Sequence, residues 1–261
     1  ISLRNPLSAD LSELRVSLLP SLLEVVRTNH AVGERDVQVF ELGRVHAPGD
    51  PALETGRLGI VIAGRLGGES WTGAGAPADF STITAIVDGL LGRLGIDAER
   101  RPRSGDPLLH PGRAAELVVG GERLGVLGEL HPGLASALEL DVAAAELDLA
   151  ALGAVAIDGA AFAAYSQFPP VLQDVAVVVD RAVEAAALLR AARDAGGALL
   201  RDARVFDVYD DAERLGPGRV SIALRLTFQA DDRTLAEDEA SEIRERVVAA
   251  LVAAFGAELR G

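Results

Sequence analysis

The apolar positions in the first part of the chain follow two helical stripes and two alternating runs. One stripe occupies residues 19–30 at helical spacing, with Pro20 in the first turn, where its missing N–H is tolerated. A second stripe, residues 83–94, follows Asp79, a residue type that caps helix N-termini. The alternating runs predict strands at 37–45 and 56–63. This part of the chain therefore mixes helices and strands.

Further along, two apolar runs flank Gly120-Gly121 and predict a β-hairpin within residues 110–133, because glycine accepts the positive φ of tight hairpin turns. Gly125 and Gly128 leave one strand with little side chain, so we expect another backbone or a ligand close to it. The other expected elements are a loop at 64–78 containing Trp71, a short helix at 134–140 and a strand at 145–149.

The rest of the chain repeats a strand–helix rhythm. Strands are expected at 171–180, 199–209, 219–229 and 257–260, with helices at 183–194 and 235–255. This βαββαβ order is that of a ferredoxin-like domain. The alanine-rich stretch 150–166 has weak periodicity and ends near Phe168-Pro169-Pro170, so we place a boundary there, with domains at 1–165 and 166–261. The fold class expected is α+β.

Composition limits the classes of function. The chain of 261 residues has a formal net charge of −14, whereas proteins that coat nucleic acid non-specifically carry a basic surface. No apolar run approaches the ~20 residues of a membrane span, so no membrane partner is expected. The absence of cysteine excludes disulfides and fits a reducing compartment. The sequence also has no methionine, so Ile1 cannot be a natural start and we expect a piece of a longer protein.

Motifs for catalysis or metal binding are missing. None of the four histidines has a partner at metal-ligand spacing, and no nucleophile elbow, phosphate-binding loop or dinucleotide fingerprint occurs. His110 and His131 each begin a His-Pro-Gly tripeptide, which we interpret as a turn and not as a ligand. A hydrolase using both histidines would lack a nucleophile motif. We predict no catalytic residue, metal or cofactor for this chain.

The strand at 219–229 separates two kinds of side chain. One face carries five apolar residues, from Val220 to Phe228, and we assign it to the core together with Phe206 and Val208 of the preceding strand. The other face is then open and polar. Its members are Asp174, Asp207, Tyr209, Arg219, Ser221, Ala223, Arg225, Thr227 and Gln229. Arginines beside an aromatic ring on an open sheet are typical of domains that stack unpaired RNA bases; the alternative is a solvated face with ordinary cross-strand pairs.

A series of ordered motifs resembles the C-terminal half of bacterial phenylalanyl-tRNA synthetase β subunits over nearly the whole chain. The matching segments are Asn5-Pro6-Leu7-Ser8, Leu14-Arg15 with Ser17-Leu18-Leu19-Pro20 and Leu22-Leu23, Phe40-Glu41-Leu42-Gly43, His110-Pro111-Gly112-Arg113-Ala114-Ala115, Gly128-Glu129-Leu130-His131-Pro132, Phe168-Pro169, Asp174-Val175-Ala176, Phe206-Asp207-Val208-Tyr209, Ser221-Ile222-Ala223 and Arg233-Thr234-Leu235. The resemblance implies an inactive module, related to class II synthetase cores, followed by a ferredoxin-fold anticodon-binding domain.

The family's catalytic site lies in the α subunit, and the residues here fit an inactive module. The second motif of a working class II site needs an arginine to clamp ATP phosphate, and the matching position here is Glu41. The third motif needs a glycine and an arginine, and the matching residues 146–152 contain neither. A carboxylate would repel phosphate. We therefore predict no aminoacylation by this chain alone; ATP and Mg²⁺ are expected only for the cytoplasmic heterotetrameric holoenzyme.

The resemblance also implies partners, namely the α subunit and tRNA(Phe), but not DNA. The candidates for the interface with the α subunit are Leu19, Leu22, Leu23 and Val26. The alternative interpretation is that these side chains fill the module's own core. The tRNA-binding candidates are Asp174, Asp207, Tyr209, Arg219, Ser221 and Arg225. Gln173 departs from the arginine that often precedes this aspartate in the family. A different function remains open, because βαββαβ domains also sense amino acids in regulatory modules.

Overall fold

A computed structural model describes residues 1–5, 12–47, 53–71, 73–156 and 166–260. Contacts divide the chain into two units, residues 1–161 and residues 162–261, and each is described by itself. The boundary expected between residues 165 and 166 borders on the stretch 157–165, which lies outside the described residues. None of the helices in the described part of the chain is both long and apolar enough to cross a lipid bilayer.

The first unit is built on a six-stranded sheet with the order β1-β2-β8-β7-β6-β5, in which all neighbours are antiparallel. Its strands are β1 (Val37–Ala47), β2 (Leu53–Ala63), β5 (Glu99–Pro102), β6 (Leu109–Val119), β7 (Glu122–Leu130) and β8 (Val142–Asp148). Strand β5 was not expected. It is four residues long and mostly charged, so its side chains give no apolar alternation.

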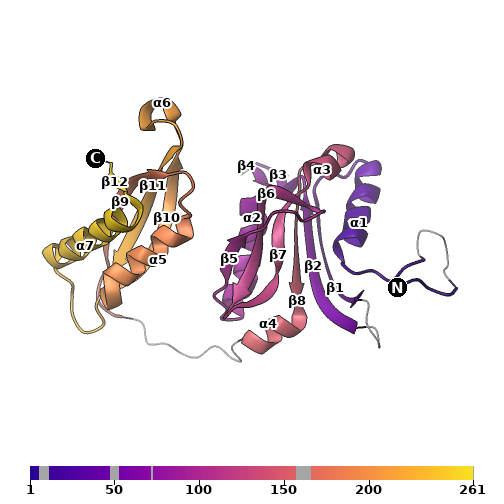
Figure 1. Ribbon diagram of the computed structural model, residues 1–261, viewed down its shortest axis with the longest axis horizontal. Helices are drawn as coiled ribbons and strands as arrows, with labels where there is room; N and C mark the ends of the chain where they lie inside the picture. The colour runs from indigo at the N-terminus through magenta and orange to yellow at the C-terminus, as the bar shows by residue number, and fades with distance from the viewer. Residues whose placement is uncertain (6–11, 48–52, 72, 157–165, 261) are drawn as a thin grey trace. The chain divides into compact units, whose positions relative to one another are not determined.

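Helices cover both faces of this sheet (Figure 1). The helices α1 (Leu19–Ala31) and α3 (Pro132–Leu138) pack on one face, where Leu22 and Val26 join a buried cluster. The helices α2 (Phe80–Arg93) and α4 (Leu149–Val155) pack on the other, around Ile83 and Leu127. Successive strand residues point to opposite faces, so β2 supplies Val61 to the first cluster and its neighbour Ile62 to the second.

Several local predictions are confirmed. Asp79 is the N-cap of α2, and its Oδ1 accepts a hydrogen bond from the Thr82 N–H at 2.8 Å. Gly120 and Gly121 join β6 to β7 with φ of +59° and +90°, as a tight hairpin requires. Another backbone does lie against Gly125, since a Cβ at that position would come within 2.3 Å of the carbonyl oxygen of Glu146.

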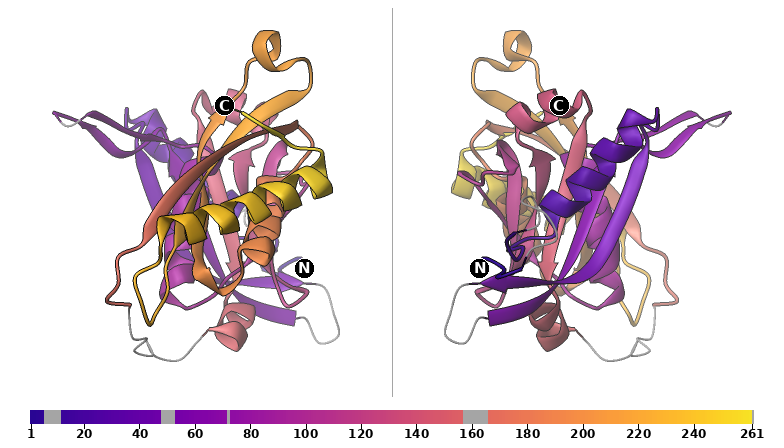
Figure 2. Two further views of the ribbon diagram at one scale, coloured as in Figure 1. Left: turned by 90° about the vertical axis from the view of Figure 1, so that its left-hand side faces the viewer. Right: turned by 90° about the vertical axis from the view of Figure 1, so that its right-hand side faces the viewer.

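The expected loop at 64–78 is wrong. Apart from residue 72, which lies outside the described residues, it forms a two-stranded ribbon of β3 (Arg65–Ser70) and β4 (Gly73–Pro77), which projects from the larger sheet (Figure 2). Glycines remove the side-chain alternation that identifies a strand, yet they let the two backbones approach closely. A Cβ on Gly75 would lie 2.1 Å from the carbonyl oxygen of Leu66. Trp71 is 97% exposed at the end of this ribbon.

The second unit is a four-stranded antiparallel sheet with the order β10-β11-β9-β12. Its elements are β9 (Val171–Asp180), α5 (Ala185–Gly196), a 3-10 turn (Gly197–Leu199), β10 (Leu200–Tyr209), the one-turn helix α6 (Ala212–Leu215), β11 (Arg219–Phe228), α7 (Glu237–Phe255) and β12 (Glu258–Leu259). The α+β prediction and its βαββαβ order are confirmed, with α6 added in the connection between the two middle strands.

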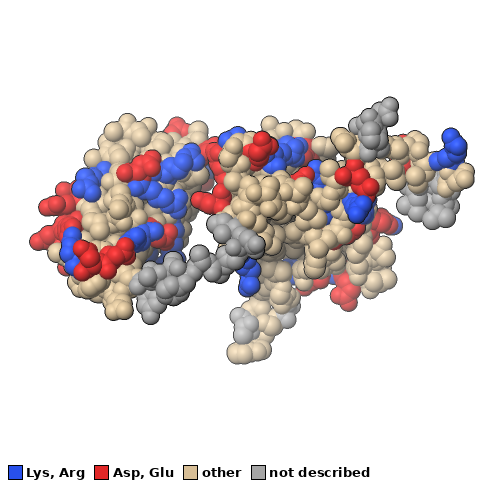
Figure 3. Space-filling model, turned by 90° about the horizontal axis from the view of Figure 1, so that it is seen from below, with Lys and Arg blue, Asp and Glu red and all other residues tan. Residues whose placement is uncertain are grey.

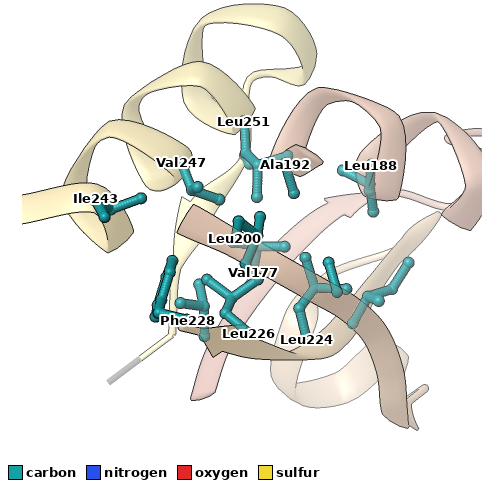
Figure 4. Close-up of a cluster of buried hydrophobic side chains, with 14 of the residues drawn as sticks. Val177, Leu188, Ala192, Leu200, Leu224, Leu226, Phe228, Ile243, Val247 and Leu251 are labelled. Carbon is teal, nitrogen blue, oxygen red and sulfur yellow. The ribbon is translucent and has the colours of Figure 1, made fainter. Parts of the chain in front are cut away.

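Both long helices of this unit pack on one face of its sheet. Leu188 and Ala192 of α5 and Val247 and Leu251 of α7 point toward strand residues such as Leu226, and all five are buried (Figure 4). The opposite face is left without a helix. The amphipathic pattern of two helices thus produces a sheet with one apolar, covered face and one open face.

Candidate nucleic-acid interface

The open face of the second unit is set by strand β11. Its apolar residues from Val220 to Phe228 are buried at alternate positions, which confirms the predicted core side. The intervening Ala223, Arg225 and Thr227 are partly exposed on the other side. The neighbouring strand β9 pairs with β11 without a register shift, and β10 pairs with it with two shifts, so both strands extend the same face on either side of β11.

Arg225 and Asp174 lie opposite each other across β11 and β9. The guanidinium Nε and Nη2 donate to the two carboxylate oxygens at 2.8 Å and 2.7 Å, a bidentate pair. The hydrogen bond from Arg225 lowers the pKa of Asp174, and the bond to Asp174 raises the pKa of Arg225. Both predicted residues therefore lie on the face and bind each other, which fixes the plane of the guanidinium group.

The expectation that Phe206 belongs to the core is wrong. The pairing of β10 with β11 shifts between Val205, opposite Leu224, and Asp207, opposite Ala223, so one extra residue is inserted at a β-bulge. The bulge interrupts the alternation and brings Phe206 to the open face, where its ring lies 4.7 Å from Cζ of Arg225. Phe206 is 47% exposed.

Val208 is also misassigned, for a different reason. It lies opposite Ile222, and thus on the side of the sheet predicted for it, but it is 56% exposed. Neither helix buries this end of β10, which extends toward α6. Asp207 is exposed, as the prediction of an open position requires.

Tyr209 lies near the end of the face, where its hydroxyl is hydrogen-bonded and an arginine lies against its ring. Its O–H donates to Oδ2 of Asp211 at 2.6 Å, and Cζ of Arg260 lies 4.5 Å from the ring centroid. The hydrogen bond to Asp211 raises the pKa of the Tyr209 phenol. Asp211 also caps α6, because its Oδ1 accepts a hydrogen bond from the backbone N–H of Glu213 at 3.0 Å. Asp211 and Arg260 were not predicted.

Ser221 is not accessible, although it points to the side predicted for it. It is 3% exposed and lies between Tyr209 and Val178 of the two neighbouring strands. Nearby, Arg219 donates to Oε1 of Glu258 at 2.8 Å and to the carbonyl oxygen of Val178 at 3.3 Å, which links β11 to the C-terminal segment. A hydroxyl as buried as that of Ser221 is not available to contact a base directly.

The charges of the face are mixed. Arg219 and Arg225 each contact a carboxylate of the same unit, and Arg260 lies on Tyr209. Figure 3 likewise shows basic side chains interspersed with acidic ones on the surface in view. The face therefore presents aromatic rings beside guanidinium groups that already have partners within the unit, and it does not form a broad basic patch.

In the first unit, the two carboxylates at the places of the missing phosphate-binding residues have structural partners. Glu41 accepts a hydrogen bond from Nη2 of Arg15 at 2.7 Å. Oε1 of Glu146 accepts from the Ser17 hydroxyl at 2.9 Å and from the Leu18 N–H at 2.6 Å, directly before α1. A carboxylate at a helix N-terminus satisfies a free N–H and complements the helix dipole. Both side chains thus hold the segment that leads into α1 against the sheet.

The interface candidates on α1 lie mostly in the module's own core. Leu19, Leu22 and Val26 are 3%, 4% and 0% exposed, and Leu23 is partly buried against the same cluster. The structure therefore favours the alternative in which this stripe fills its own domain. Of the four, Leu23 is the one that keeps exposed surface for a partner.

The interpretation of the two His-Pro-Gly tripeptides as turns is wrong: residues 110–112 lie in β6, where its pairing with β7 is irregular, and His131 is the N-cap of α3. Nδ1 of His110 accepts from the Gly112 N–H at 3.0 Å, and Nδ1 of His131 accepts from the Gly133 N–H at 3.2 Å. A ring nitrogen that accepts such a bond is not free to bind a metal through the same lone pair. Across the described ranges, no three His, Asp or Glu side chains are grouped in a way that could hold a metal ion.

Three groups important to the described geometry were missed by sequence reasoning. Phe206 was assigned to the wrong face, Arg260 was only placed in a last short strand, and Glu146 was considered only as a residue that cannot bind phosphate. For a fourth missed group, Asp211, the sequence offers a weak indication, since an aspartate followed by two helix-forming residues is a possible cap. The other contacts join residues far apart in the chain.

Comparisons with known proteins cover both units. Residues 1–149 match the family model described as the phenylalanyl tRNA synthetase beta chain CLM domain, and residues 166–260 match the model of the ferredoxin-fold anticodon binding domain. The phenylalanine–tRNA ligase beta subunit of Symbiobacterium thermophilum is 43% identical over 265 residues, which cover 100% of this chain and 30% of that protein. The corresponding protein of Nocardia farcinica is 39% identical, with 98% and 34% covered.

The chain thus spans about a third of the length of the curated relatives it matches. Among solved structures, a pyrrolysyl tRNA synthetase of Desulfitobacterium hafniense aligns with 58% of this chain and 52% of its own at 17% identity, with a TM-score of 0.43. That likeness is too weak to support an argument.

Proposed function

The chain belongs to the family of phenylalanine–tRNA ligase β subunits, and from this we propose that its second unit binds the anticodon region of tRNA(Phe) in the cytoplasm. The observation that carries the proposal is the open face on a domain of the anticodon-binding family, where Phe206 is exposed, Tyr209 is partly exposed and an arginine lies beside each ring. Aromatic rings and guanidinium planes are the groups on which proteins stack unpaired RNA bases.

Asp207, Tyr209 and Arg225 are the candidates that this proposal keeps in direct contact with RNA. Asp174 acts by holding Arg225, and Arg219 by holding the C-terminal segment. Ser221 is left with a role inside the sheet because it is buried. Asp207 offers an acceptor for the amino or imino groups of a base, and the carboxylate would repel a phosphate placed there.

We assign the first unit a non-catalytic role in assembly with the α subunit. Its residues do not fit an ATP–Mg²⁺ site, since Glu41 and Glu146 are carboxylates engaged by Arg15 and by the segment before α1. The ATP and Mg²⁺ of aminoacylation then belong to the α subunit. The expected result is that the chain alone forms no adenylate in a pyrophosphate-exchange assay with phenylalanine; measurable exchange would overturn the assignment.

The assembly role is tested by a matched pair on α1. Leu23→Asp changes the partly exposed member of the stripe, and we expect a smaller complex with the α subunit by native mass measurement while the first unit stays folded. Leu22→Asp places a charge in the core and is expected to unfold the unit. If Leu23→Asp assembles like the wild type, α1 is not part of the interface.

The binding proposal is tested by two calorimetric titrations of the chain, one with tRNA(Phe) and one with phenylalanine. An anticodon-binding domain gives heat with tRNA and none with the amino acid, whereas an amino-acid-sensing regulatory module gives the reverse. Tyr209→Ala is expected to weaken tRNA binding by roughly 5- to 150-fold, the range for loss of one stacked base. Unchanged affinity would remove Tyr209 from the site.

A further inference from the structure

The bulge in β10 has a consequence for the size of the binding face. Without it, strict alternation would put Val205 and Asp207 on one face of the sheet and Phe206 on the other. The inserted residue instead lets Phe206 and Asp207 share the open side with Tyr209. A large apolar ring is thereby exposed on a face that is otherwise polar, at a cost in buried apolar surface.

The exposed ring is held in place by an ordered guanidinium group. Asp174 binds both Nε and Nη2 of Arg225, so the plane of the guanidinium is fixed, and Cζ lies 4.7 Å from the Phe206 centroid, within the range of a cation–π contact. One side of the ring faces Arg225, and with 47% of the residue exposed, much of the rest faces solvent. The ring needs no rearrangement to accept a flat partner.

Tyr209 and Arg260 repeat this arrangement at the other end of the face. Phe206 and Tyr209 are three residues apart on β10, so the two side chains leave the strand about 10 Å from each other at the rise of a strand. Bases stacked directly on each other are only ~3.4 Å apart. Two bases held by these two rings would therefore not be neighbours in one stack.

We propose that Phe206, held by Arg225 and Asp174, is a second base-stacking site, which binds an unpaired nucleobase at the same time as Tyr209 binds another. The RNA that fits is a loop with its bases splayed outward, and not a duplex or a continuous single-stranded stack. This inference rests on the proposed tRNA-binding function and adds a second contact to it. Phe206 stacks the base, and Arg225 adds positive charge beside it.

The test compares variants of the full 261-residue chain for binding to a labelled tRNA(Phe) transcript. Phe206→Ala and Phe206→Leu are both expected to weaken binding roughly 5- to 150-fold, because leucine restores bulk but offers no π-face. Phe206→Trp is expected to stay near the wild-type affinity. Val208→Ala is the matched control, since Val208 is 56% exposed on the same strand but faces the other side, and it is expected to change nothing.

Two further readouts separate stacking from a general loss of structure. Phe206→Ala removes no charge, so the slope of log affinity against log salt is expected to match the wild type. Its effect and that of Tyr209→Ala are expected to multiply in the double variant, as for two independent contacts.

Each alternative outcome has a definite meaning. Wild-type affinity in Phe206→Ala, while Tyr209→Ala binds weakly, overturns the second site and leaves the tRNA-binding function intact. If Phe206→Leu binds tRNA with wild-type affinity, Phe206 does not act by stacking. If the double variant binds tRNA no more weakly than Tyr209→Ala, the two rings contact one shared base and not two. If the wild-type chain binds no tRNA, the proposed function fails and this inference fails with it.

Discussion

At the scale of single residues, the most constrained position of the first unit is Gly125. The strands β7 and β8 approach so closely there that an added Cβ would lie 2.3 Å from the carbonyl oxygen of Glu146 and 2.7 Å from Cδ2 of Leu147. The carbonyl belongs to the sheet and cannot move aside without loss of pairing. We expect Gly125→Ala to lower the free energy of unfolding by about 1–3 kcal/mol or more, as overpacking does.

The matched control for this substitution is Gly89→Ala. Gly89 lies inside α2, is exposed, and has no atom near the position of an added Cβ. Alanine favours a helix over glycine by about 0.5–1 kcal/mol, so this variant is expected to be more stable than the wild type. Urea denaturation monitored by circular dichroism measures both. Equal stability of Gly125→Ala and wild type would contradict the close approach of the two strands.

Tyr209 offers a second residue-scale prediction, concerning its pKa. The hydrogen bond to the carboxylate of Asp211 favours the neutral phenol, so the pKa is raised above the usual value of about 10 and ionisation is delayed to higher pH. The sequence has two tyrosines, so Tyr165→Phe leaves Tyr209 as the only one to titrate. Ultraviolet absorbance in this background follows the phenolate directly.

Asp211→Asn tests the cause of that shift. The amide removes the negative charge but still provides an oxygen to cap α6, because asparagine is as good an N-cap as aspartate. We expect the pKa of Tyr209 to fall toward its usual value. A titration that does not change would show that the carboxylate is not the partner of the phenol in solution.

At the scale of elements, α1 is fastened to the sheet by Glu146. Its carboxylate accepts hydrogen bonds from the Leu18 N–H and from the Ser17 hydroxyl. An alanine at position 146 removes the acceptor of both bonds. We expect Glu146→Ala to cost about 0.5–2 kcal/mol of stability, the usual loss for a helix N-cap. The same denaturation experiment measures this value.

Glu24→Ala is the comparison for Glu146→Ala. Glu24 pairs with Arg27 one turn further along α1, but both side chains are largely exposed. Exposed ion pairs contribute little to stability, so we expect the urea midpoint of this variant to match that of the wild type. If Glu146→Ala loses as little stability as Glu24→Ala, the hydrogen bonds of Glu146 do not hold α1 in place.

The elements also show what sequence could and could not predict. α2 and the β6–β7 hairpin were predicted because their signals are local: a stripe behind Asp79 and a pair of glycines between apolar runs. The β3–β4 ribbon was missed because its strands are held by backbone pairing between glycine-rich segments. Periodicity of side chains carries no information about such pairing.

The candidate site was predictable to a similar extent. Alternation along β11 placed Arg225 on the open face and Val220 in the core. It failed for Phe206, because a bulge is a property of two paired strands and not of either alone. It also failed for the burial of Ser221, because alternation gives the side to which a residue points and not how much of it the neighbouring strands cover.

At the scale of the whole molecule, the net charge of −14 makes broad electrostatic attraction of RNA unfavourable. Under the proposed function, stacked bases and paired arginines supply the affinity for RNA, so each variant above is designed to change a single contact.

The division into two units predicts independent unfolding. The buried cluster around Leu251 draws its residues only from 171–257, and the cluster around Leu127 only from the first unit. Leu251→Ala and Leu127→Ala each remove a side chain that is 0% exposed, at a typical cost of 2–5 kcal/mol. Because no described core residue is shared, we expect calorimetry to show two transitions, with each variant lowering the midpoint of one. A single transition that both variants shift would mean that the units unfold as one cooperative body.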